Sequence, residues 1–136
     1  MAAEDQFHVG IVVDDLDATL AQLSDLFGYA WCEQIAAPTS VSLPDGDAVL
    51  DFRITYSMNT PRLEIIQAMP GTLWVPAAGS GIHHIGYWSN DVARAAGAAD
   101  PDALVQLART TLTTLGGAPD GTDAPELAVV DDVKGL

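Results

Sequence analysis

The sequence predicts an α+β protein built from paired βαβββ modules, of which the second is shortened or divergent. Three observations lead to this fold class: an internal repeat, a helix pattern followed by three strand patterns in the first copy, and a stretch rich in Gly and Pro between the copies. We expect a first βαβββ module at residues 1–70, a linker at 71–81, and a second, incomplete or divergent module at 82–136.

The repeat becomes visible when the sequence is shifted on itself by 76 positions, which places "FHVGIVVDDL" at 7–16 over "HHIGYWSNDV" at 83–92. Three positions of this alignment are identical: His8 and His84, Gly10 and Gly86, Asp15 and Asp91. A repeat at a fixed offset indicates duplicated structural units. Each copy begins as a strand rich in β-branched and aromatic residues and ends on an acidic turn.

The first copy continues with a helix at 16–27, which Asp15 can cap and Gly28 can end. The apolar stripe of this helix consists of Leu16, Leu20, Leu23 and Phe27. Strand-like segments then follow at about 30–36, 47–57 and 62–68. The turns between them are Pro44-Asp45-Gly46 and Asn59-Thr60-Pro61.

The second copy matches this pattern only at its start. After the linker "MPGTLWVPAAGSG" and the repeated strand, the best helix pattern lies at 101–115, with Asp100 as its cap and Gly116-Gly117 as its end. A last strand is predicted at Glu126–Val130. Because an incomplete module would expose strand edges, we expect a homodimer.

Composition restricts the classes of partner. Five basic and nineteen acidic residues give a net charge of −14, which would repel nucleic acid. This acidity indicates either the soluble surface of a protein from a salt-rich or GC-rich organism, or attraction of a cationic ligand. With no apolar run long enough to span a membrane and no signal-peptide pattern at the N-terminus, we expect a cytoplasmic protein. Cys32 is the one cysteine, which excludes an intrachain disulfide.

Alternation along the repeated strands predicts which side chains share a face. His8, Gly10 and Val12 lie on one face of the first strand, whereas His83 points away from the face of His84 and has a structural role. In "RLEIIQA", Glu64 stands within an apolar run and needs a partner or a metal. If the first and last strands of the first unit are adjacent, His8 and Glu64 can meet. The alternative is a strand-edge glutamate with two core histidines.

The segments "FHVGIVVDDLDATLAQLSDLFGY", "RLEIIQA" and "GIHHIGYWSND", in this order and spacing, resemble the vicinal oxygen chelate superfamily. Its members include glyoxalase I, methylmalonyl-CoA epimerase, extradiol dioxygenases and bleomycin-resistance proteins, and they pair two βαβββ modules around a U-shaped cleft. The resemblance implies a divalent metal ion held by His8, Glu64 and His84. The family's fourth position, a glutamate, would fall at 140, past the last residue, so Glu126 is the nearest candidate for ligand or proton carrier.

Other residues are candidates for binding a small-molecule substrate. Trp88 shares the face of His84 and is the first choice for a pocket wall, with plain core packing as the alternative. Arg53 and Arg62 could hold a substrate carboxylate or phosphate, or could pair with surface aspartates.

The resemblance leaves several functions open. The first is a metal-dependent enzyme, a glyoxalase-like lyase or an epimerase or isomerase acting through an enolate, with Zn, Ni, Co, Mn or Fe as its ion. The second is a metal-free binder of a cationic aromatic ligand, as in the bleomycin-resistance branch. An extradiol-type dioxygenase and an inactive structural descendant are further alternatives.

Overall fold

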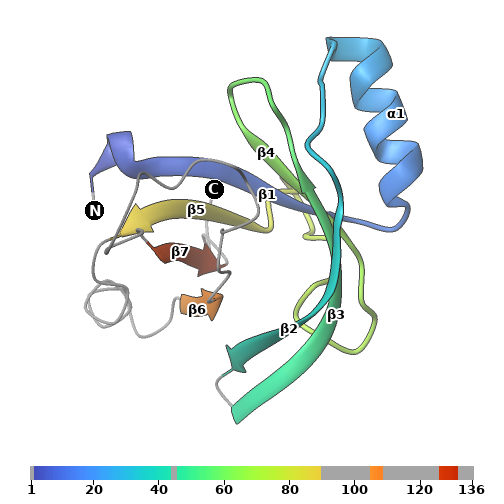
Figure 1. The fold of residues 1–136 in the computed structure, drawn as a ribbon. Coiled ribbons are helices and arrows are strands. Elements are labelled where there is room, and N and C mark those ends of the chain that lie inside the picture. Colours follow the sequence, from blue (N-terminus) through green and yellow to red (C-terminus); the bar gives the residue numbers. More distant parts are fainter. Residues whose placement is uncertain (1, 44–45, 90–104, 109–125, 132–136) are drawn as a thin grey trace.

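The computed structural model of the protein describes residues 2–43, 46–89, 105–108 and 126–131 (Figure 1). Its elements in chain order are a 3₁₀ helix η1 (Ala3–Asp5), β1 (Gln6–Val13), α1 (Leu16–Phe27), β2 (Ile35–Leu43), β3 (Gly46–Tyr56), β4 (Leu63–Gln67), β5 (His84–Ser89), β6 (Val105–Ala108) and β7 (Glu126–Asp131). None of the helices in the described part of the chain has the length and apolarity needed to cross a bilayer.

The strands form one mixed sheet in the order β1-β4-β3-β2-β6-β7-β5, which closes because β5 also pairs with β1. The β1–β4 pair is parallel and the other pairs are antiparallel. Strands β1 to β5 curl into a half-barrel with α1 against its outside, and β6 and β7 complete the ring (Figure 1). This arrangement confirms the predicted α+β class and the βαβββ order of the first unit.

Helix α1 has the predicted bounds and caps. The Asp15 carboxylate accepts a hydrogen bond from the amide of Ala18 at 2.9 Å, and Gly28 ends the helix in the left-handed region with φ of 72°. Leu16 and Leu20 are buried against Ile65 of β4. The predicted apolar stripe is wrong at its last position, because Phe27 is 70% exposed and burial is confined to the first half of the helix.

The predicted strand at 30–36 is wrong in its position, since β2 spans Ile35–Leu43. Its pairing with the long strand β3, from Ile35 with Ile54 to Leu43 with Gly46, determines where it lies. Upstream of β2, the strand-type pairing of Trp31 is limited to an isolated bridge with Ser57. The strand propensity of a single segment gives no information about the distant strand with which it pairs, so the sequence could not locate β2. Of the predicted turn, Pro44 and Asp45 lie outside the described residues.

The second copy departs from the prediction in one described segment. Residues 105–108, predicted as helix, form β6, which pairs with both β2 and β7. Closure of the sheet therefore outweighs the helical spacing of leucines at this point. The rest of the predicted helix lies outside the described residues, as do its cap and end. The predicted last strand is confirmed as β7. The module boundaries and the homodimer stay predictions.

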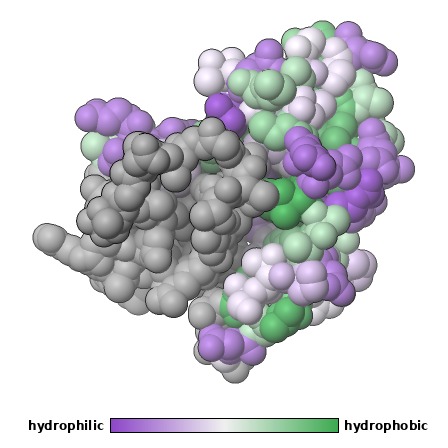
Figure 2. Space-filling model, viewed as in Figure 1, coloured by the Kyte–Doolittle hydropathy of each residue, from purple (hydrophilic) through white to green (hydrophobic). Residues whose placement is uncertain are grey.

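The sheet has an outer face under α1 and an inner face inside the curve. Alternation along β3 and β4 puts Thr55 and Ile65 outside, and Tyr56, Glu64 and Ile66 inside. The linker also contributes to the inner core, because the ring of Trp74 packs edge-on against Phe52 with centroids 4.7 Å apart. Hydrophilic side chains are seen around α1 and at the tip of the β2–β3 hairpin, as expected for a chain of net charge −14 (Figure 2).

Candidate metal centre

Three adjacent strands bring His8, Glu64 and His84 together on the inner face. Strand β1 lies between β4 and β5, and the register pairs Gly10 with Glu64 on one side and with His84 on the other. The glycine therefore stands between two large side chains that project from its neighbours. The predicted adjacency of the first and last strands of the first unit is confirmed by the parallel β1–β4 pair.

The repeated glycines make room for the histidines. A Cβ atom added to Gly10 would lie 2.2 Å from Cε1 of His84, and one added to Gly86 would lie 2.3 Å from Cε1 of His8. Each histidine ring thus lies over the glycine of the other copy. Between them, Val9 pairs with Ile85, its equivalent at the offset of 76. The antiparallel strands β1 and β5 are therefore related by a local twofold axis at this pair.

The donor atoms of the three side chains converge. His8 Nε2 lies 3.1 Å from His84 Nε2, His84 Nε2 lies 2.7 Å from Glu64 Oε2, and His8 Nε2 lies 3.3 Å from the same oxygen. All three residues are buried, with exposed fractions of 1% for His8, 6% for Glu64 and 2% for His84. Of the alternative, two core histidines and a strand-edge glutamate, the burial of the histidines agrees with the structure, but Glu64 is not at an edge, because β4 pairs with both β1 and β3.

Tyr56 determines which oxygen of Glu64 is available. Its hydroxyl donates a hydrogen bond to Glu64 Oε1, which leaves Oε2 facing the two histidines. Burial raises the pKa of the Tyr56 hydroxyl well above its ordinary value, and the charge of Glu64 and their hydrogen bond raise it further. Tyr56 therefore keeps its proton and acts as a donor.

The charge of Glu64 is set by opposing effects. Burial alone would raise the pKa of its carboxyl, but the charge of His8 and the hydrogen bonds from His8 and His84 outweigh burial and hold the pKa well below the usual value of 4.5. Glu64 is thus a buried, ionised carboxylate. Such a group needs a cation or several hydrogen-bond donors around it.

This donor set fits a divalent metal ion. Two imidazole nitrogens and one carboxylate oxygen are a common ligand set of catalytic zinc and of other first-row ions. Donors that share one ion at about 2.0–2.1 Å in tetrahedral geometry lie about 3.3 Å apart. The separations of 3.1 and 3.3 Å agree with this value, and the 2.7 Å separation is shorter. All three donors would be available as ligands with both histidines neutral.

The family described as the Glyoxalase/Bleomycin resistance protein/Dioxygenase superfamily matches residues 7–103, more than half of the chain. The chain belongs to this superfamily. No curated protein and no solved structure matches it. The predicted resemblance is confirmed at the level of the superfamily, whose members carry out several different activities.

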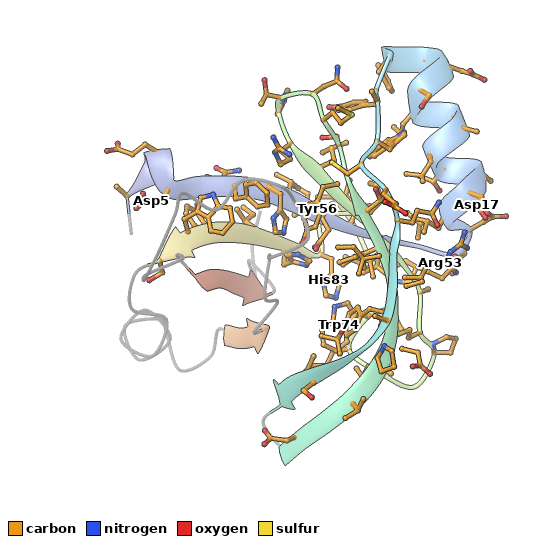
Figure 3. All side chains as sticks on the ribbon, viewed as in Figure 1. Asp5, Asp17, Arg53, Tyr56, Trp74 and His83 are labelled. Atoms are coloured by element: carbon orange, nitrogen blue, oxygen red, sulfur yellow. The ribbon has the colours of Figure 1, made fainter. Side chains whose placement is uncertain are left out.

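In this superfamily member, His83 does not point away from the site as predicted. Strand β5 begins at His84, so the alternation of a strand does not extend to the preceding residue. His83 is buried, and its Nδ1 lies 2.9 Å from Nδ1 of His84 while its Nε2 lies 2.9 Å from the carbonyl oxygen of Leu73. Figure 3 shows His83 inside the curve of the sheet, close to Trp74.

Phe7 is a neighbour of the site that sequence reasoning missed. The β1–β5 register shifts between Gln6 and His8, and such a bulge re-aims the side chain of the extra residue. The ring of Phe7 is edge-on to His8, with centroids 5.4 Å apart, and contacts Trp88 at 4.6 Å. The half-buried Trp88 is therefore one ring away from His8. The repeat aligns Phe7 with His83, and this was the sequence signal that could have placed Phe7 beside the site.

The two candidate arginines lie on different sides of the sheet. Arg53 is on the outer face of β3, where its guanidinium pairs with both carboxylate oxygens of Asp17 at 2.7 Å and with Gln34 (Figure 3). The structure does not bring it to the metal centre. Arg62 instead lies over the ring of Phe7, 5.0 Å from its centroid, and donates to the carbonyl of Ser57.

Glu126 stands at the start of β7, where the register pairs it with Ser89, while Asp131 is the residue paired with His84. These two pairs are five positions apart along the strand, which is about 16 Å at the usual rise. The side chain of Glu126 is outside what the structure describes, so its role as proton carrier stays a prediction.

Proposed function

We propose that this protein is a metal-dependent enzyme of the glyoxalase type, a lyase or isomerase acting on a small oxygenated substrate. The observation that supports this most strongly is the convergence of His8 Nε2, His84 Nε2 and Glu64 Oε2 at a buried point where three strands meet. A binding protein for an organic ligand has no need of a buried carboxylate with two imidazoles around one of its oxygens.

The residues of the chain have separate tasks in this proposal. His8, Glu64 and His84 hold the ion, and the hydroxyl of Tyr56 occupies Oε1 of Glu64, so that Oε2 is the oxygen that faces the ion. When bound, a divalent ion supplies Lewis acidity toward substrate oxygens and so favours loss of a proton from the adjacent carbon. Glu126 is proposed to carry that proton. Trp88 and Phe7 are proposed to pack against the apolar part of the substrate.

Elemental analysis of untagged protein, purified without chelators, tests the proposal. We expect near one equivalent of zinc, nickel, cobalt, manganese or iron per chain, lost in His8→Ala and in Glu64→Gln. Glu33→Gln is the matched control, because it makes the same chemical change at an exposed position and should keep the metal. No metal in the wild type, even after dialysis against each ion, would exclude the three-ligand site.

The same measurement separates the enzyme from its alternatives. Bound iron would favour the extradiol-type dioxygenase, since two histidines and one carboxylate also form the ligand set of non-haem iron oxygenases. Absence of metal would favour a metal-free binder. The contact of Trp88 with Phe7, together with the net charge of −14, supports a cationic aromatic molecule as the ligand in that case. Light scattering would test the proposed homodimer independently.

A further inference from the structure

A chain of hydrogen bonds runs from the backbone through His83 to the metal centre. The carbonyl oxygen of Leu73 can only accept, so Nε2 of His83 donates to it over 2.9 Å. A neutral imidazole carries one N–H, so Nδ1 of His83 is an acceptor. Its partner at 2.9 Å, Nδ1 of His84, must then be the donor. Nδ1 of His84 therefore carries a proton. Its Nε2, which is hydrogen-bonded to Oε2 of Glu64 at 2.7 Å, would present its lone pair to an ion that replaces this hydrogen bond.

The backbone at both ends of this chain is held in place. The amide of His83 donates to the carbonyl of Gly10 on β1 at 2.9 Å. The segment around Leu73 is fixed by hydrogen bonds of 2.8 Å from Met69 N to Trp74 O and of 3.0 Å from Trp74 N to Thr72 Oγ1. The buried indole of Trp74 adds packing against the core. The acceptor at Leu73 therefore belongs to a structured part of the linker and not to a free loop.

The other copy of the repeat provides an internal comparison. Phe7 is the equivalent of His83, and it packs on His8 at 5.4 Å and 83°, nearly as His83 packs on His84 at 5.3 Å and 85°. The phenyl ring has no nitrogen to accept a hydrogen bond. Nδ1 of His8 is buried and has no hydrogen-bond partner among the described residues. The ring position is thus the same in both copies, but only His84 has an acceptor that orients it.

We propose that His83 is a positioning residue which, through its Nδ1, fixes His84 in the tautomer that presents Nε2 to the metal. This rests on the proposed function, because it assigns a role within the same site. Partners behind a metal-binding histidine fix its tautomer and ring orientation and make it a better ligand. His84 is then the preformed ligand of the pair. When His8 binds the ion through Nε2, its proton must lie on Nδ1, for which the described residues offer no acceptor.

Two substitutions at His83 separate hydrogen bonding from packing. His83→Phe reproduces the residue found in the other copy, keeping an aromatic ring but removing the acceptor. His83→Asn loses the ring but puts an amide oxygen near the place of Nδ1. We expect zinc affinity, measured by competition with a chromophoric chelator, to fall about 10- to 100-fold in His83→Phe. Most of this loss should be recovered in His83→Asn. Thermal unfolding monitored by circular dichroism confirms that each variant is folded.

Nitrogen-15 spectra of the imidazole groups give a second readout that is independent of activity. In the zinc-loaded wild type and in His83→Asn, the Nδ1 proton of His84 should be observed and protected from exchange with water. In His83→Phe this signal should broaden or disappear. A structural role alone would weaken both variants according to their lost packing and would leave His83→Asn the worse of the two.

The outcomes separate this inference from the proposed function. If the wild type binds none of the tested ions, the proposed function fails and the inference fails with it. If the wild type binds zinc and folded His83→Phe binds it equally tightly, only the role of His83 is overturned. If His83→Phe does not fold, the inference is decided by His83→Asn, which must keep both the affinity and the protected proton.

Discussion

Strands β1 and β5 carry the same histidine and glycine but differ in the residue before the histidine. In both strands the histidine ring lies over the glycine of the other strand, and an aromatic ring packs edge-on against it. On β5 that ring is His83, which contacts Nδ1 of His84. On β1 it is Phe7, and Nδ1 of His8 has no hydrogen-bond partner in the described part of the chain. The two halves of the site, β1 with Phe7 and β5 with His83, therefore have the same shape. Among the described residues, only the β5 half has a polar group next to the Nδ1 atom of its histidine.

The largest effect on metal binding is expected at the two glycines, because the histidine of each strand lies over the glycine of the other. Gly10→Ala and Gly86→Ala each place a methyl group within 2.3 Å of a histidine ring of the opposite strand. We expect either change to displace that ring, to abolish metal binding, and to cost about 1–3 kcal/mol of unfolding free energy. Urea unfolding and zinc titration measure the two effects. Retention of tight zinc binding by either variant would show that the crossed packing is not required.

Tyr56→Phe removes the hydroxyl that donates a hydrogen bond to Glu64, the carboxylate that contacts both histidines. The buried Oε1 then loses its hydrogen bond, which should destabilise the protein by about 1–3 kcal/mol and weaken metal binding. Tyr29→Phe is the matched control, because the hydroxyl of Tyr29 is exposed and lies 3.4 Å from the carbonyl of Pro61. Chemical denaturation should show little change in the control. Equal effects of the two substitutions would argue against a role for Tyr56 in holding Glu64.

Phe7→His would give the first half the polar support of the second. If the new ring keeps the orientation of Phe7, its nitrogen can accept from Nδ1 of His8. We expect zinc affinity to increase, by roughly tenfold at most. Phe7→Leu keeps an apolar residue and should give no increase, and chelator competition compares the two. A decrease in Phe7→His alone would indicate that the apolar ring of Phe7 is needed where Arg62 lies over it.

The smallest effect is expected on the outer face, away from both halves. The hydrogen bond from Arg53 lowers the pKa of Asp17, with a further contribution from Gln34. Because the folded-state pKa lies below the ordinary value of 3.8, this pair stabilises the protein above that pH and the contribution is lost as the pH falls below it. Unfolding of Asp17→Asn should therefore differ slightly from wild type at pH 7 and converge with it in acid. An undiminished difference at pH 2 would contradict this sign.

Local patterns were sufficient for much of the fold and for the three proposed ligands. Capping residues and apolar spacing predicted α1, and period-two alternation put His8 on one face with Gly10 and Val12. The repeat then selected His84 over His83 as the equivalent of His8. The isolated charge of Glu64 in an apolar strand signalled that it needed a partner, because an unpaired buried carboxylate is costly.

Other features depended on contacts between distant segments. The position of β2 was set by pairing with β3, and β6 became a strand because it joins β2 to β7. The inward direction of Phe7 came from a bulge that appears only when β1 pairs with β5. The pairing of Arg53 with Asp17 required α1 to lie against the outer face.

The sequence by itself determined the repeat and the helix with its caps, since each of these depends on the order and spacing of residues, and it was enough to single out His8, Glu64 and His84 as the proposed ligands. Only the tertiary structure decided that Glu64 presents a single oxygen, that each glycine accommodates the opposite histidine, and that His83 contacts His84. Those features depend on strand register and on where a strand begins. A shift of one residue in either would turn the side chains to the other face of the sheet.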